Sequence, residues 1–327
     1  MSELHKFIFE GLPVRGMLVR LTGSWQEVLQ RRHEAGDTFP SPVRALLGEM
    51  AAAAVLMHAN LKFNGAIVLQ MFGDGPVKLA VAEVQSDLAF RTTAKVVGPV
   101  GEGARLEALL NVGGKGRCAI MLDPAKKMPG QQAYQGVVAL HGDHREPLQH
   151  LSDVLEHYML QSEQLDTRLV LAADDKLAAG LLIQRMPIAG AGNLGGTSPR
   201  SADEDQIGRN EDYKRIAHLA ATLTREELLT QGADTILRRL FWEERLRRFE
   251  PMSGATGPRF ACSCSRERVG GMLKALGRDE IEGIVVEQGR VEIACDFCGR
   301  KYHFDPVDVG GLFTPASDQM PGSQAIN

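Results

Sequence analysis

The sequence has few cysteines, no long apolar run and no excess of charge of one sign. Five cysteines in 327 residues are too few for a scaffold built from disulfides. The longest apolar run, residues 45–59, is interrupted by Glu49 and His58 and is shorter than the roughly 20 residues that span a bilayer. The 37 Lys and Arg residues against 41 Asp and Glu residues leave a net charge of -4. No strong field attracts nucleic acid or a membrane, and we predict neither as a partner.

The sequence also lacks signals for secretion and for nucleotide-driven chemistry. Glu3 and Glu10 lie where a signal peptide would need a basic start followed by an apolar stretch. No Walker A sequence is present, which argues against an ATP-driven machine. We expect a cytoplasmic protein that is not an enzyme and has no catalytic residues.

The composition is that of a globular protein, with 44% hydrophobic and 24% charged residues. Residues 1–188 mix short alternating apolar segments with helical periods, without the regular repeat of a parallel sheet. We predict an α+β core domain here, a mixed α/β domain whose antiparallel sheet is covered by helices on one face. The predicted strands are residues 66–72, 77–84, 90–97, 117–122, 136–140, 168–172 and 181–186. The predicted helices are residues 25–35, 43–60 and 151–164.

Three local features refine this domain. The turn residues at 73–76 predict a hairpin between the first two strands. The alanines at 51–54 have no bulky side chains, so another element can pack closely over them. Cys118 alternates with Ile120 and Leu122 as in a half-buried strand, and we interpret it as a core residue without a function.

Residues 189–255 are predicted as a flexible insertion followed by a helical linker. Glycines and a Ser-Pro pair dominate residues 188–210, which is typical of a flexible segment. Thr224 and Glu227 have the spacing of a capping box, which starts a helix. A second helical period carries an apolar stripe that must dock on the first domain or on a partner, because it is too small to form a core. The stripe is Ile236, Leu237, Leu240 and Phe241.

Residues 256–313 are predicted as a small redox-sensing zinc domain, and residues 314–327 as a disordered tail. Four cysteines form two close pairs, CSC at 262–264 and CDFC at 295–298. This pattern matches one structural Zn2+ ion held tetrahedrally by four thiolates. The predicted ligands are Cys262, Cys264, Cys295 and Cys298. So few large apolar residues accompany them that the unit should unfold without its metal.

Between the two pairs we predict a helix at 269–276 and a strand-turn-strand unit with strands at 284–286 and 291–293. His303 is expected to be a strand residue within 301–304, because four thiolates already close the metal shell. Four cations near the ligands either stabilise the thiolate charge or form a solvated face. They are Arg266, Arg268, Arg300 and Lys301.

The one-residue gap between Cys262 and Cys264 favours a redox role. Cα atoms two residues apart can lie within the roughly 4.4 to 6.8 Å that a disulfide needs. Of the three pairings that four cysteines allow, short loops cost the least closure entropy once zinc is lost. The favoured disulfides are Cys262–Cys264 and Cys295–Cys298. Oxidation would then release the metal and unfold the unit, which is a recognised mode of switching.

At these residues the sequence closely resembles the 33 kDa chaperonins, the bacterial redox-regulated heat-shock holdases. The most specific matches are FACSCSRER at 260–268 and CDFCG at 295–299. Further matches are VRG at 14–16, LKF at 61–63, GDGP at 73–76, YQGVV at 134–138 and SEQL at 162–165. The resemblance covers most of the chain. The sequence departs from the family pattern in the Gly-rich insertion around 189–210 and at Asp166, where the family often has Pro.

The resemblance implies a reduced, zinc-bound and largely inactive form. It also implies an oxidised form that has lost zinc, carries the two local disulfides and exposes apolar surface. The oxidised form is expected to be a homodimer that binds unfolding or oxidatively damaged client proteins and prevents their aggregation without ATP. The residues support such a switch, because metal loss beside a conditionally stable linker would expose the apolar stripe.

Three other functions compete with this one. A zinc-ribbon nucleic-acid-binding protein is the main alternative, supported by Arg238, Arg239, Arg245, Arg247 and Arg248, but glutamates interleave with these arginines. A disulfide oxidoreductase would use the CDFC pair, which follows a strand and a turn rather than opening a helix. A zinc deaminase is disfavoured because Ala294 replaces the Pro expected before CxxC.

Overall fold

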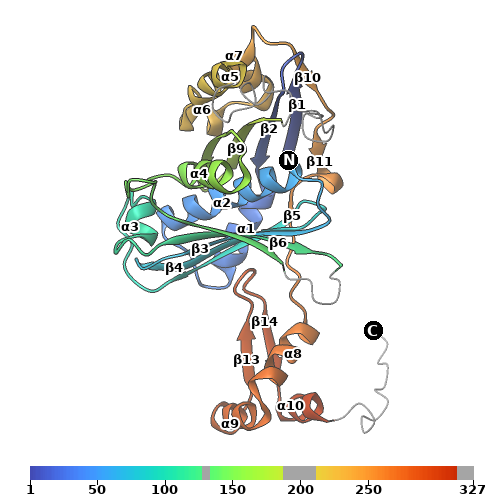
Figure 1. The fold of residues 1–327 in the computed structure, drawn as a ribbon. Helices are drawn as coiled ribbons and strands as arrows, with labels where there is room; N and C mark the ends of the chain where they lie inside the picture. The colour runs from blue at the N-terminus through green and yellow to red at the C-terminus, as the bar shows by residue number, and fades with distance from the viewer. Residues whose placement is uncertain (127–132, 187–210, 315–327) are drawn as a thin grey trace, which may run out of the picture. The chain divides into compact units, whose positions relative to one another are not determined.

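The computed structural model describes residues 1–126, 133–186 and 211–314, which form two compact units divided between Ala261 and Cys262 (Figure 1). The predicted insertion at 188–210 lies outside the described residues, as does the predicted tail except for Thr314. Among the described helices, none combines the length and the apolar character needed to cross a membrane.

The first unit contains two six-stranded sheets. The first sheet has the order β10 (Leu246–Arg248), β1 (Glu3–Phe9), β2 (Val14–Leu21), β9 (Ala178–Arg185) and β8 (Thr167–Ala173), with β11 (Met252–Ser253) paired to β1. The second has the order β12 (Arg259–Phe260), β5 (Ala89–Val96), β4 (Val77–Val84), β3 (Gly65–Phe72), β6 (Arg117–Pro124) and β7 (Tyr134–Ala139). Every pair except β12 with β5 is antiparallel, which confirms the predicted α+β class and the β3–β4 hairpin.

The central helix α2 (Ser41–Asn60) lies between the two sheets (Figure 1). It packs against β2, β8 and β9 on one side and against β3, β4 and β5 on the other. The expectation of one sheet with helices on a single face is therefore wrong. Because α2 is covered by both sheets, its apolar residues surround the helix instead of forming one stripe.

Small residues bring the first sheet close to α2. A Cβ on Gly180 of β9 would lie 2.8 Å from Leu56 Cδ1 and 3.6 Å from Ala52 Cβ. A Cβ on Gly48 of α2 would lie 2.5 Å from the Cβ of Ala173. The first sheet thus packs closely over α2 at Ala52, one of the four alanines at 51–54.

Three more helices complete the body of this unit: α1 (Gly23–Glu34), α3 (Leu106–Leu110) and α4 (Leu151–Glu163). Helix α1 buries Trp25, whose Nε1 donates a hydrogen bond to the backbone oxygen of Asp174 at 2.7 Å. Helix α4 packs against β7 and β8. The structure confirms the predicted helices at 25–35 and 151–164 and adds α3.

The helices α5 (Glu211–Ala221), α6 (Arg225–Thr230) and α7 (Ala233–Phe241) cover the face of the first sheet opposite to α2. The predicted capping box forms, since Thr224 N donates to Glu227 Oε2 at 3.0 Å and Glu227 N donates to Thr224 Oγ1 at 3.2 Å. The apolar stripe is buried, and Phe241 packs edge-on against Phe9 with 5.0 Å between ring centroids. The stripe therefore docks on the first unit.

The second unit contains α8 (Arg266–Leu276), α9 (Arg278–Gln288), β13 (Val291–Ala294), β14 (Lys301–Phe304) and α10 (Pro306–Phe313). The predicted strand at 284–286 is wrong, because these residues belong to α9. Ile281, Ile284 and Val285 share one face of that helix and join the core, whereas Val286 is 86% exposed. Gly289, in the left-handed region at φ 76°, ends the helix.

Candidate metal centre

Two loops bring the four predicted ligands together. Cys262 and Cys264 precede α8, and Cys295 and Cys298 lie in the turn between β13 and β14. In that turn Cys295 N donates to the backbone oxygen of Arg300 at 2.9 Å, and Gly299 N donates to that of Cys295 at 2.8 Å. Gly299 has φ 70°, a conformation that favours glycine. The hairpin therefore holds the second pair of thiols in a tight turn.

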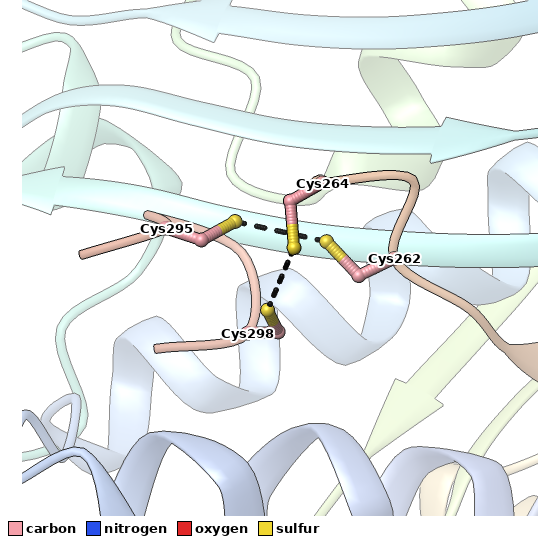
Figure 2. A group of neighbouring side chains, drawn as sticks. All are labelled: Cys262, Cys264, Cys295 and Cys298. Carbon is pink, nitrogen blue, oxygen red and sulfur yellow. Dashed lines mark hydrogen bonds between the residues drawn. The ribbon is translucent and has the colours of Figure 1, made fainter. Parts of the chain in front are cut away.

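The four thiols point toward one another (Figure 2). All four Sγ atoms lie within 4.8 Å of each other. The Cys262 and Cys295 sulfurs are 3.6 Å apart, and the Cys264 and Cys298 sulfurs are 3.4 Å apart. Four sulfurs at about 2.3 Å from a tetrahedral Zn2+ would be about 3.8 Å from one another, so the donor set and its spacing fit such an ion.

Side chains around the thiols hold the two loops in place. The Tyr302 hydroxyl donates to Cys264 Sγ at 3.1 Å. Ser265 caps α8 by accepting a hydrogen bond from Arg268 N at 3.2 Å, and Arg268 Nη1 donates to Ser263 Oγ at 2.7 Å. The contact of Tyr302 was not predicted, because its only signal in the sequence is the alternation of residues 301–304.

The four flanking cations divide into separate roles. Arg266 pairs with Asp308 at 2.7 Å, and Lys301 pairs with Glu292 at 2.9 Å. The Tyr302 hydroxyl, followed by the nearby sulfurs, raises the pKa of Arg300. Arg266, Arg268 and Lys301 therefore hold the surrounding structure, whereas the charges of Cys264 and Cys298 act on Arg300.

Proximity changes the acidity of these thiols. The hydrogen bond between Cys262 and Cys295 lowers the pKa of Cys295 to about 4 and raises the pKa of Cys262. Burial raises the pKa of Cys298. A cluster of thiols that already favours a thiolate is suited to a divalent metal ion, which binds the deprotonated form.

The remaining candidates are not part of the centre. Cys118 is fully buried on β6, and burial raises the pKa of its thiol to about 12, as expected for an inert core residue. His303 lies on β14, where its Nδ1 is 3.3 Å from Glu292 Oε2. No disulfide joins the five cysteines, all of which lie in the described part of the chain, so the predicted disulfides Cys262–Cys264 and Cys295–Cys298 stay predictions.

The fold and the site together define an α+β protein that carries a separate four-cysteine unit able to hold a metal ion. The chain belongs to the Hsp33 family: the model of that family, described as Hsp33 protein, matches residues 2–305. This finding confirms the resemblance to the 33 kDa chaperonins. Family membership supports a chaperone role.

Individual relatives agree with this assignment. The chain is 45% identical over 312 residues to the 33 kDa chaperonin of Chromobacterium violaceum, covering 95% of this chain and 94% of that protein. It is 42% identical over 323 residues to the 33 kDa chaperonin of Methylobacillus flagellatus, covering 98% and 97%. The crystal structure of the 33 kDa chaperonin from Thermotoga maritima, 18% identical, covers 95% of this chain at a TM-score of 0.70, which shows the same fold.

Proposed function

We propose that this protein is a cytoplasmic, redox-regulated and ATP-independent holdase chaperone. In its reduced form one Zn2+ ion is bound by Cys262, Cys264, Cys295 and Cys298, and the protein is inactive. Oxidation releases the ion, forms disulfides and leads to a homodimer that binds unfolding client proteins. The observation that carries the proposal is the convergence of four sulfurs within 4.8 Å in a unit with a small core.

The small core makes folding of this unit dependent on the metal. Its buried apolar members are Leu273, Ile281, Val291, Tyr302, Phe304 and Val309. Structural zinc supplies about 10 to 16 kcal/mol of apparent binding free energy at neutral pH, which exceeds the stability expected from a core of this size. Loss of the metal should therefore unfold the unit and make its thiols accessible.

The disulfide pairing is a separate part of the proposal. In the folded unit the nearest sulfurs belong to different loops, Cys262 with Cys295 and Cys264 with Cys298. In the unfolded unit, short loops favour Cys262 with Cys264 and Cys295 with Cys298. We propose the local pairs, because release of the metal and unfolding of the unit would precede the formation of both disulfides.

The test is to count zinc and free thiols before and after peroxide treatment and to map the disulfides by mass spectrometry. Suppression of aggregation of a thermally unfolding enzyme is measured in each state. We expect one zinc to leave, four thiols to disappear and suppression to appear only afterwards. Cys118 should stay reduced because it is fully buried, and Cys118→Ser serves as the matched control.

Two outcomes would contradict parts of this proposal. Cross-loop disulfides would show that oxidation occurs in the folded unit, and would overturn the proposed order of steps. Zinc that stays bound without any suppression would make the cysteine unit purely structural. Salt-dependent nucleic-acid binding would then be the better function, although Arg239 and Arg248 of the linker already pair with Glu227 and Asp234.

A further inference from the structure

The Val14-Arg15-Gly16 motif is only partly explained by the fold. Gly16 is required because a Cβ there would lie 2.2 Å from the ring of Phe7. Arg15 points to the opposite side of the first sheet, toward the end of α2, where its Nη2 donates to Gln184 Oε1 at 2.6 Å. Among the described residues, the buried Nε of Arg15 has no hydrogen-bond partner. A water molecule or a bound anion could accept a hydrogen bond from this group.

The strand register places two more cations beside Arg15. Arg15 of β2 is opposite Ile8 of β1, and Ile8 is opposite Arg247 of β10, so the three side chains project to the same face. Lys6 lies two residues before Ile8 on that face, and its Nζ donates to the backbone oxygen of Ala59 at 2.9 Å. Lys6, Arg15 and Arg247 are called the cation patch below.

Among the described residues, no carboxylate neutralises the cation patch. Within the described residues, none of its three members forms an ion pair with a carboxylate. Burial lowers the pKa of Lys6 and of Arg15, and the charge of Arg15 lowers that of Lys6 further. Like charges on neighbouring strands destabilise a sheet, so the patch is costly unless an anion neutralises it.

On the opposite face of these strands and of β9, two of the cations form ion pairs. Arg248, which follows Arg247 on β10, pairs with Asp234 at 2.7 Å. Arg185, which follows Gln184 on β9, pairs with Asp166 at 3.0 Å. The described residues thus supply no carboxylate for the cation patch, which leaves it able to bind an anion.

We propose that the cation patch binds a small phosphoryl anion, such as inorganic phosphate, pyrophosphate or a phosphate monoester. Three cations match an anion of two or more charges better than a carboxylate, which carries one. Arg15 and Arg247 can each donate two parallel hydrogen bonds to phosphoryl oxygens, and the Lys6 ammonium adds a point charge. The proposal is independent of the redox function, and its test involves no redox step.

The test is a calorimetric titration of the reduced, full-length protein with inorganic pyrophosphate at low ionic strength. Arg15→Gln and Arg247→Gln should each weaken binding by about tenfold or more, as expected for loss of a charge-assisted contact. Arg248→Gln is the matched control, because it removes a neighbouring cation from the opposite face, and it should leave the affinity unchanged. Arg247 is exposed, so its variant should fold normally even if Arg15→Gln does not.

Three results would overturn the proposal. The first is no binding by the wild-type protein, and the second is equal losses in Arg247→Gln and Arg248→Gln, which would indicate unspecific charge attraction. The third is that a single-stranded oligonucleotide of about ten nucleotides binds more tightly than pyrophosphate and that Arg247→Gln loses this binding. This result would assign the patch to nucleic acid instead.

Discussion

At the residue scale, Glu49 of the central helix α2 is a partly buried acid with a strongly raised pKa, and it contacts α6. Its side chain is 19% exposed, and its Oε1 accepts a hydrogen bond from Arg225 Nη1 of α6 at 3.1 Å. Burial raises the pKa of Glu49 to about 7, although Arg225 opposes the shift. In the sequence this residue was notable only as an interruption of an apolar run.

The pKa of Glu49 predicts how stability depends on pH. A carboxyl group whose pKa is raised by folding contributes stability that is complete below its unfolded value, 4.5, and is lost as the pH rises through about 7. The full loss is about 3 kcal/mol, since each pH unit corresponds to about 1.4 kcal/mol. Urea denaturation should show that the free energy of unfolding of the wild-type protein falls by an amount of this order between about pH 5 and about pH 8. The same change in pH should have a smaller effect on Glu49→Gln.

A matched variant controls this measurement. Glu27 of α1 has a side chain that is 43% exposed and pairs with Arg31, so Glu27→Gln should keep the pH dependence of the wild-type protein. Equal pH dependence in the wild-type protein and Glu49→Gln would show that Glu49 is not the source of the effect.

At the scale of elements, the contact of α7 with the first sheet decides whether apolar surface is exposed. Ile236 is fully buried in the cluster that joins α5 to α7 with β1, β2 and β9. Thr235, the preceding residue, is exposed on the other side of the helix. The two neighbours thus allow the same substitution to be compared inside and outside the contact.

Ile236→Asp should release α7 from the sheet in the reduced protein, because an unpaired charge cannot be buried in an apolar cluster. The expected loss is about 3 kcal/mol or more of the docking free energy. Binding of a fluorescent apolar dye should rise without oxidation in Ile236→Asp and stay at the wild-type level in Thr235→Asp. An increase in both variants would argue that the charge acts through general destabilisation.

The elements also show where local patterns fail as predictors. Residues 284–286 have the β-branched composition of a strand, yet contacts of Ile281, Ile284 and Val285 with the core of the second unit make them helical. Strands β1 and β2 were not predicted, because residues on both of their faces are buried and no polar-apolar alternation results.

At the scale of the whole molecule, the two units differ in what stabilises them. The first unit has two large apolar clusters, one around α2 and one beneath the helices α5, α6 and α7. The second unit has one small cluster beside four thiols. Removal of a metal ion should therefore affect the units unequally.

Treatment of the reduced protein with a strong chelator should unfold only the second unit. Hydrogen exchange measured by mass spectrometry should become fast for residues 262–313, while β3, β4 and α2 keep their protection because their contacts do not involve the thiols. Readdition of zinc should restore protection. Cooperative loss of protection in both units would show that the metal stabilises the first unit as well.

The sequence by itself determined which four cysteines form one cluster, the capping box at Thr224 and the amphipathic character of α7. These features depend on spacing within a few residues, and the chemistry of thiolates and helix ends follows from that spacing. Only the tertiary structure decided that α2 lies between two sheets, that residues 284–286 are helical and that Lys6, Arg15 and Arg247 share one face. Those features depend on which distant segments pack or pair together. The register between β1 and β10 joins residues far apart in the chain, so a local sequence pattern cannot predict it.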